Sequence, residues 1–124
     1  MIDELQPQAV IFSDGGPGCR WVGNEHGFAG ATNWSFLRAG EVYPGYPKYR
    51  ELQYGHADGN QWVAAECDVS IRPGWFYHPE EDDRVKTVDE LTDLYYRSVG
   101  HNATLLLNFP VDRDGLIHPT DSAN

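Results

Sequence analysis

The sequence has few basic residues and no long apolar segment. Only 9 of its 124 residues are Lys or Arg, against 19 Asp and Glu, which gives a formal net charge of −10. Such an acidic chain repels phosphate groups and anionic lipids, so nucleic acids and membrane surfaces are not expected partners. No apolar run approaches the ~20 residues of a membrane span, and the first residues, MIDELQPQ, lack the basic and apolar regions of a signal peptide.

Cysteine is nearly absent, and no metal-binding pattern accompanies it. Cys19 and Cys67 are far apart in the chain and lack the spacing of a metal site. Two buried thiols are expected, with one disulfide as the alternative. Because no phosphate-binding loop or nucleotide motif occurs either, we expect no cofactor and no metal.

Aromatic residues, in contrast, are abundant. They make up 13% of the chain, with four Trp and seven Tyr. This content argues against disorder and favours either a dense core or a surface that stacks on sugar rings. With 40% hydrophobic residues, a chain of 124 residues can form about one small core, so a second domain is not expected.

Strand and loop signals dominate the first half of the chain. The apolar run 9–12 stops at Ser13 and Asp14 and meets Gly-Gly-Pro-Gly, which predicts a buried strand that ends in a turn. Residues 20–59 are rich in Gly, Pro, Asn and Tyr and show no helical or alternating period. Since a loop this long in a compact domain is usually functional, we expect a binding surface there.

A second strand is predicted in the middle of the chain. Residues 68–72 alternate in type and precede Pro73 and Gly74, which is the pattern of a strand followed by a turn. Glu66 is expected at the entrance of this strand.

A helix and a third strand follow. Thr87 and Glu90 have the spacing of a capping box, apolar residues then recur at helical spacing, and Gly100 is expected to end the helix over 88–99. The continuous apolar run 103–108 is typical of a strand buried on both faces of a parallel sheet. The order of elements predicts an α/β fold.

Three carboxylates near the predicted strand ends are candidates for catalysis, because a parallel α/β barrel places its active site at the carboxyl ends of its strands. Asp14 follows a buried strand and is either a nucleophile or an ordinary turn residue. Glu66 adjoins a Trp-bearing segment, where desolvation would raise its pKa and suit it to act as a general acid, or it is a surface residue. Glu25, in WVGNE, is its rival, and the sequence does not rank the two.

Three long motifs carry a family resemblance. They are IFSDGGPGCRWVGNEHG, WVAAECDVSIRPGWFYH and SVGHNATLLLNFPVDRDGLIHPTD, in this order. Together they resemble the α-L-fucosidases of glycoside hydrolase family 29, and most closely the subgroup that favours α1,3- and α1,4-linked fucose. The resemblance runs nearly end to end. It implies a (β/α)₈-like TIM barrel, of which residues 1–124 would be the C-terminal half.

The resemblance also implies a retaining mechanism without a cofactor. Asp14 takes the position of the nucleophile that attacks the anomeric carbon, and Glu66 takes that of the general acid/base. Trp75 is expected to cover the apolar face of fucose, with a buried core aromatic as the alternative. Further expected substrate contacts are Arg72, Phe12, Arg20, Trp21, Asn24 and Glu25.

Structural alternatives exist for several of these contacts. Arg72 could form a brace with Asp68, and His78 is expected to be a hydrogen-bonding loop residue. Phe12 stands where many family members have Trp, which keeps an apolar wall but removes an indole N–H donor. The residues that could simply hold the loop together are Arg20, Trp21, Asn24 and Glu25.

A complete barrel needs ~200 residues, so the resemblance implies that the first half, with its paired histidines, is missing. The expected partners are a fucosylated oligosaccharide or glycoprotein glycan, and either a chain that supplies the missing half or another copy that associates through open sheet edges. The alternative function is a non-catalytic remnant that binds carbohydrate. By resemblance the protein would be secreted or periplasmic, although the chain shows no signal peptide.

Overall fold

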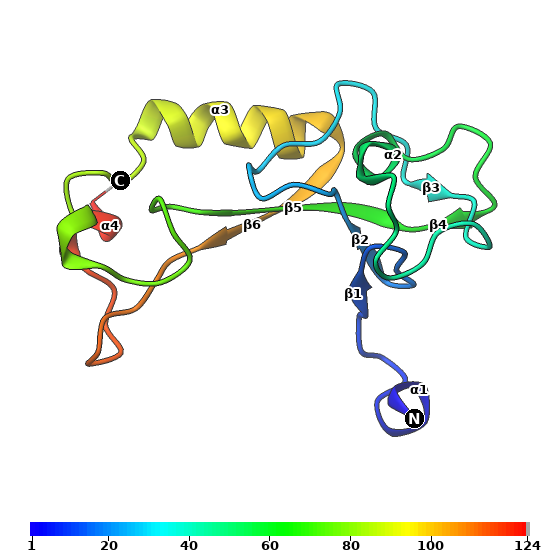
Figure 1. Ribbon diagram of the computed structural model, residues 1–124, viewed down its shortest axis with the longest axis horizontal. Helices are drawn as coiled ribbons and strands as arrows, with labels where there is room; N and C mark the ends of the chain where they lie inside the picture. The colour runs from blue at the N-terminus through cyan, green and yellow to red at the C-terminus, as the bar shows by residue number, and fades with distance from the viewer. Residues whose placement is uncertain (124) are drawn as a thin grey trace.

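The computed structural model describes residues 1–123 and is built around a parallel sheet. The sheet has the strand order β1-β2-β5-β6, and all neighbouring pairs in it are parallel. Its strands are β1 (Phe12–Ser13), β2 (Cys19–Trp21), β5 (Ala64–Ser70) and β6 (Ala103–Asn108). Figure 1 shows β1 upright and β5 and β6 lying across the view, so the sheet is strongly twisted. The expected parallel strands of one sheet are confirmed.

The first strand is shorter than predicted. Val10 is 74% exposed and lies outside β1, which contains only two residues. The chain returns to start β2 through a tight turn in which a Cβ on Gly18 would lie 2.7 Å from Ile11 N. Only glycine fits this close approach, and the turn leaves Asp14 at the carboxyl end of β1.

The predicted long loop 20–59 is in fact partly ordered. Besides β2 it contains β3 (Phe36–Leu37) and α2 (Tyr49–Tyr54), and β3 pairs antiparallel with β4 (Gln61–Trp62). These elements enclose a small core, whose members are Leu37, Val42, Tyr46, Leu52 and Val63. Elements of two to six residues held by tertiary contacts leave no periodic pattern in the sequence, which is why this unit was missed.

The helix prediction is confirmed at its start and wrong at its end. In α3 (Val88–Ser98) the Thr87 hydroxyl accepts from Glu90 N while the Glu90 carboxylate accepts from Thr87 N. The chain then continues through a 3₁₀ turn, Val99–His101, and the left-handed residue is Asn102, with φ 59°. Gly100 is therefore not the cap.

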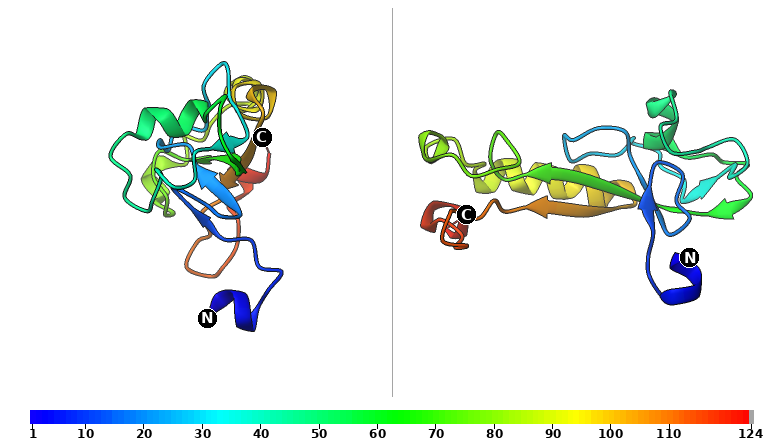
Figure 2. Two further views of the ribbon diagram at one scale, coloured as in Figure 1. Left: turned by 90° about the vertical axis from the view of Figure 1, so that its right-hand side faces the viewer. Right: turned by 60° about the horizontal axis from the view of Figure 1, so that its bottom comes forward.

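One face of the sheet is covered and the other is open. Ala65 and Cys67 of β5 are buried with Val22 and Ala29, and α3 runs alongside β6 (Figure 2). Burial alternates along β6, and Leu106 is 50% exposed, so the expectation of burial on both faces is wrong in this chain. Its partner residue in β5 is Asp68, which lies on the same open face.

Both cysteines are free thiols, as expected, but only Cys67 is buried and Cys19 is partly exposed. Burial raises the pKa of Cys67 to about 12 and that of Cys19 to about 11. The remaining short helices are α1 (Ile2–Leu5), the 3₁₀ turn Pro79–Glu81 and α4 (Pro119–Ser122). Among the helices of residues 1–123, none has the length and apolar character needed to cross a membrane.

Candidate active site

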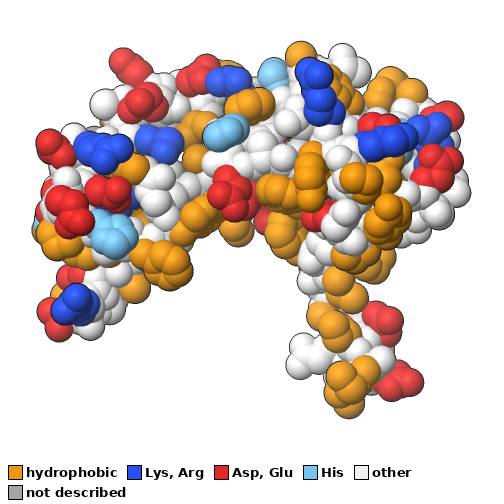
Figure 3. All heavy atoms as spheres, viewed as in Figure 1, with side chains coloured by type: hydrophobic (Ala, Val, Ile, Leu, Met, Phe, Trp, Pro, Cys, Tyr) orange, Lys and Arg blue, Asp and Glu red, His pale blue; other side chains and the backbone are white. Residues whose placement is uncertain are grey.

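The parallel strands end at a common edge of the sheet, where the segments that follow them gather. Asp14 follows β1, Glu25 lies four residues beyond β2, and Trp75 lies five residues beyond β5. In Figure 2 both β5 and β6 point toward the end of the molecule where the segments after them lie. In the space-filling view of Figure 3 the molecule is hollowed between projections at its two ends.

Two hydrogen bonds, each from an indole to a carboxylate, connect β2 and β5 and the segments that follow them. The Trp75 indole Nε1 donates to Glu25 Oε2 over 3.0 Å, and the Trp21 indole Nε1 donates to Asp68 Oδ1 over 2.7 Å. Asn108, the last residue of β6, donates from its side-chain amide to the Trp75 carbonyl over 3.1 Å. We call these five residues, drawn from the ends of three strands, the edge cluster.

The charges of the edge cluster influence one another. Burial raises the pKa of Asp68 above its ordinary value, and the neighbouring Glu25 carboxylate raises it further, while the hydrogen bond from Trp21 opposes the shift. Glu25 itself is exposed and lines a cavity of about 300 Å³ with Trp75 and Pro73. Glu25 is therefore reached by solvent, held by the Trp75 indole and close to a second carboxylate, that of Asp68. These features are typical of a residue that acts as a general acid or base.

Glu66 lies inside β5, in register with Trp21 at the end of β2. It is the third residue of β5 and stands four residues before Ser70, so about 13 Å of strand separates it from the carboxyl end. Its carboxylate Oε2 accepts a weak hydrogen bond from Cys19 Sγ over 3.5 Å. The expected position at the entrance of the strand is therefore wrong.

Asp14 and Glu66 are not joined by any hydrogen bond found in residues 1–123. Ser13 is in register with Arg20, which is in register with Ala65. The next row places Asp14 level with Glu66 and two strand spacings away, about 9–10 Å between backbones. Asp14 Oδ2 accepts instead from Gly45 N over 2.6 Å, which ties the turn to the loop before α2.

The structure corrects the expected substrate contacts of the two arginines. Arg20 has no exposed surface, and its guanidinium donates to the carbonyls of Leu52, Trp34 and Val63 and to Asn33 Oδ1. Burial lowers the pKa of Arg20 to about 10. Arg20 thus fastens the β3–α2 unit to the sheet.

Arg72 is 1% exposed, and its guanidinium also donates to other groups of the protein. Its guanidinium forms a bidentate pair with Asp121 of α4, donates to Asp82 over 2.8 Å and reaches the His78 carbonyl over 3.3 Å. These carboxylates raise the pKa of Arg72. The brace anticipated as the alternative exists, but its partners are Asp121 and Asp82, not Asp68. Arg72 fixes the segment after β5 to the C-terminal helix.

The other predicted contacts fall in two groups. Trp75 and Trp21 are half-buried in the edge cluster, and Phe12 is 46% exposed on the open face of the sheet, in register with Cys19. Asn24 is used locally, since its amide donates to the Phe28 carbonyl.

Sequence reasoning missed the contributions of Asp68 and Asn108. The alternation of β5 would have revealed Asp68, since it places Asp68 on the same face as Glu66. Asn108 could have been found as a polar residue that ends an apolar strand. Within residues 1–123 no three His, Cys, Asp or Glu side chains gather closely enough to hold a metal ion.

The chain is similar to segments of longer known proteins. No protein-family model matches the chain. Alpha-L-fucosidase 1 of Arabidopsis thaliana is 48% identical over 126 residues, which cover 98% of this chain and 24% of that protein. The crystal structure of a glycoside hydrolase 29 family member from an unknown rumen bacterium has a TM-score of 0.87 and 49% identity, covering 98% of this chain and 22% of that one.

In sequence and in fold, the chain matches a segment of the family 29 α-L-fucosidases. A Ruminococcus gnavus GH29 fucosidase is a more distant match, with a TM-score of 0.70 and 37% identity over 83% of this chain and 21% of that one. The chain spans about a quarter of the length of the relatives that it matches. Its parallel sheet is that of a barrel fragment.

Proposed function

We propose that residues 1–124 are part of the catalytic domain of a retaining α-L-fucosidase, and that they form the C-terminal half of its barrel. The substrate would be a glycan that ends in α-L-fucose, with α1,3 or α1,4 linkage. The similar Ruminococcus gnavus structure is a complex with fucose, which supports this substrate class. The observation that carries the proposal is the Glu25–Trp75 hydrogen bond at the carboxyl edge of the sheet.

The reaction needs a carboxylate nucleophile and a general acid/base. We propose Asp14 as the nucleophile: its carboxylate would attack the anomeric carbon, and the bond to the leaving oxygen would break as a glutamic acid protonates that oxygen. That glutamate, now deprotonated, would then act as the general base and remove a proton from the water that hydrolyses the glycosyl-enzyme.

Glu66 and Glu25 compete for the acid/base role, and the geometry favours Glu25. Glu25 is exposed beyond the end of β2 and receives the Trp75 indole, whereas Glu66 lies within β5 and receives the Cys19 thiol. In barrel enzymes the reacting groups lie beyond the carboxyl ends of the strands.

An active protein is needed to test these roles, and a chimera supplies one. In it, this chain replaces the matching segment of the rumen bacterial relative. Removal of the true acid/base should slow hydrolysis most for substrates with poor leaving groups, because an activated aryl fucoside needs little protonation. Added azide should restore turnover of the aryl fucoside by that variant. We expect this pattern in Glu25→Ala and not in Glu66→Ala; the reverse pattern would assign the role to Glu66.

Asp14 has a structural partner, so its variant must separate two effects. Asp14→Asn keeps an oxygen that can accept from Gly45 N but cannot act as a nucleophile. We expect it to abolish turnover with little change in thermal stability. Full turnover in Asp14→Asn would place the nucleophile outside this chain and leave Asp14 as a turn residue.

The second candidate function is carbohydrate binding without hydrolysis. Two large aromatic rings, Phe76 at 79% and Trp62 at 62% exposure, are available to stack on sugars. Binding of fucosylated glycans by a chimera that lacks all turnover would favour this function.

A further inference from the structure

The β3–α2 unit contacts the turn that follows β1, and it does so at the candidate nucleophile. Gly45 N donates to Asp14 Oδ2 over 2.6 Å. A Cβ on Gly15 would lie 3.0 Å from the Val42 carbonyl oxygen, so the two backbones are in close contact beside the carboxylate. The loop 42–46 therefore supplies a backbone donor to one of the two carboxylate oxygens of Asp14.

This donor is fixed by its neighbour Tyr46. Gly45 is exposed and has φ 80°, a left-handed conformation, whereas Tyr46 is 5% exposed and belongs to the small core of the unit. The Tyr46 hydroxyl donates to Glu51 Oε2 of α2 over 2.7 Å. Tyr46 is thus held at its ring and at its hydroxyl, and the place of the adjacent Gly45 N–H depends on it.

Glu51 is the residue at which the surrounding donors meet. The His56 ring Nε2 lies 3.2 Å from the same Oε2, and Lys48 Nζ lies 3.2 Å from Oε1. His56 Nδ1 accepts from Arg38 N over 3.1 Å, so Nε2 carries the proton and donates to Glu51. Hydrogen bonds from Tyr46 and then His56 lower the pKa of Glu51 to about 2, so this acceptor stays charged in mildly acidic solution.

The helix that carries Glu51 is fastened to the sheet that carries Asp14. Arg20, in β2, donates from Nε to the Leu52 carbonyl over 2.9 Å, and Leu52 follows Glu51 in α2. β2 is also the strand that pairs with β1. The start of this chain of contacts is therefore anchored one strand away from the carboxylate at its end.

We propose that Glu51 is a positioning residue for the nucleophile of the proposed fucosidase. It holds the Tyr46 hydroxyl and so keeps the Gly45 N–H directed at Asp14. The N–H engages Oδ2, so Oδ1 is the oxygen that would form the bond to the anomeric carbon. This inference rests on the proposed function, because it takes Asp14 as the nucleophile. Orientation matters for such a group, since an error of about 1 Å can cost roughly 100-fold in rate.

The test uses variants of Tyr46 and Glu51 in the chimera. Tyr46→Phe removes only the hydroxyl and should lower kcat/KM for 4-nitrophenyl α-L-fucoside about tenfold. Because a weakened N–H donor disfavours the charged carboxylate, the acid limb of the kcat/KM profile should also move to higher pH. Glu51→Ala should have both effects. Glu51→Gln keeps an oxygen that accepts from Tyr46 and should recover most of the rate.

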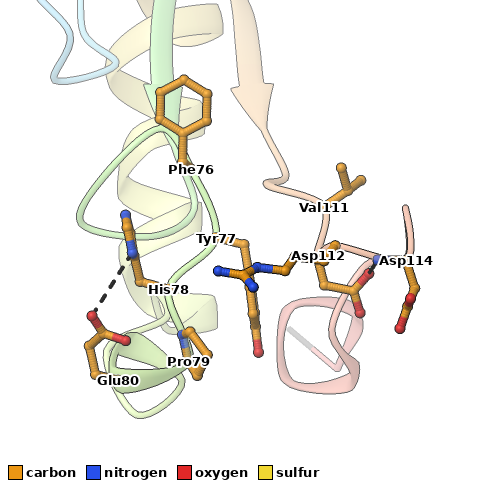
Figure 4. A pocket seen from close by; sticks show the side chains of 9 residues that line it. Phe76, Tyr77, His78, Pro79, Glu80, Val111, Asp112 and Asp114 are labelled. Atoms are coloured by element: carbon orange, nitrogen blue, oxygen red, sulfur yellow. Dashed lines mark hydrogen bonds and ion pairs between the residues drawn. The ribbon is translucent and has the colours of Figure 1, made fainter.

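Two controls separate positioning from stability. Thr87→Ala removes the capping box of α3 and should lower the midpoint of urea unfolding without changing the pH profile. Glu80→Gln breaks another carboxylate–histidine pair, in which His78 Nδ1 lies 3.9 Å from Glu80 Oε1 (Figure 4). This pair lies at the end of the molecule opposite to α2 (Figure 1), so kcat/KM should stay within about twofold.

Three results would each overturn the inference. The first is an unchanged kcat/KM and acid limb in Tyr46→Phe. The second is a Glu51→Gln chimera as slow as Glu51→Ala. The third is an equal shift of the acid limb in Thr87→Ala, which would reduce Glu51 to a stabilising residue.

A measurement without turnover separates this inference from the proposed function. In the 124-residue chain, Tyr46→Phe should speed amide hydrogen exchange at Gly45, measured by NMR, about tenfold or more. Faster exchange in this variant together with an inactive chimera would uphold the link from Glu51 to Asp14 and reject the hydrolase. Turnover in the chimera with Gly45 exchange unaffected by Tyr46→Phe would uphold the hydrolase and reject the role of Glu51.

Discussion

Trp75 and Glu25 are fifty residues apart in the sequence, yet the Trp75 indole Nε1 lies 3.0 Å from Glu25 Oε2. The contact exists because β2 and β5 are adjacent parallel strands, so the segments beyond their carboxyl ends meet. It gives the conspicuous GWFYH segment a chemical role: Trp75 holds a carboxylate in place and need not itself stack on a sugar.

We predict that Trp75→Phe lowers kcat of the chimera by about tenfold and changes KM little, because a misplaced catalytic group costs rate more than binding. The substitution keeps a ring and removes only the indole donor. Steady-state kinetics on an unactivated fucosyl disaccharide measure the effect.

Trp62→Phe is the matched control, since Trp62 lies in β4, next to the start of β5 and away from its carboxyl end. It should leave kcat within about twofold. An equal loss of kcat in both variants would show that the Trp75 indole has no special role.

Arg72→Met should destabilise the chain by about 3–5 kcal/mol, because it leaves the buried Asp121 carboxylate without its partner. Urea unfolding followed by circular dichroism measures this loss. Arg97→Met breaks an exposed pair with Asp93 at 3.4 Å and should cost less than about 1 kcal/mol. Comparable losses in the two variants would contradict the structural role assigned to Arg72.

Glu51 should make stability depend on acid pH. Hydrogen bonds from Tyr46 and then His56 lower the pKa of Glu51 from 4.5 to about 2. Between these values the unfolded chain binds a proton that the folded chain does not, so stability is present above about pH 5 and is lost as pH falls toward 2.

The comparison with Glu51→Gln isolates this contribution. The Glu51 side chain is 33% exposed, so its charge is partly screened by solvent. At pH 6 we therefore expect the free energy of unfolding of the unaltered chain to exceed that of Glu51→Gln by about 1–2 kcal/mol. The difference should shrink toward pH 2 in urea unfolding. A difference that stays constant with pH would mean that the Glu51 charge does not contribute.

The open face of the sheet should favour self-association. Leu106 is 50% exposed on this face, and Phe12 is 46% exposed on the same sheet. Sedimentation velocity at rising concentration should show oligomers, and Leu106→Asp should reduce them. A monomer at all concentrations would contradict the prediction.

The regular parts of the fold could be predicted from the sequence, since their signals are local. The capping box at Thr87 and the apolar run of β6 are visible in any short window. The end of α3 could not be predicted, because Gly100 and Asn102 both permit a helix to stop and the choice depends on the 3₁₀ turn between them.

The site was less predictable, because hydrogen bonds between distant segments decide it. Arg20 and Arg72 are residue types that suit substrate binding. Only the structure shows that both are buried and that each guanidinium nitrogen donates to the protein itself. The choice between Glu25 and Glu66 depends on whether each residue lies within a strand or beyond its carboxyl end. Glu66 lies inside β5, and not before it, because this strand begins four residues earlier than the alternation pattern indicated.

Hydrolysis of 4-nitrophenyl α-L-fucoside tests the central claim most directly. Carrying catalytic carboxylates does not suffice, because acid/base assistance supplies only ~10²–10⁴-fold and the remainder depends on holding the sugar in a complete site. We predict no turnover by the 124-residue chain alone, turnover by the chimera, and loss of that turnover in the chimera bearing Asp14→Asn. A chimera that folds but releases no nitrophenol, or that keeps full activity with both Glu25→Ala and Asp14→Asn, would contradict the account.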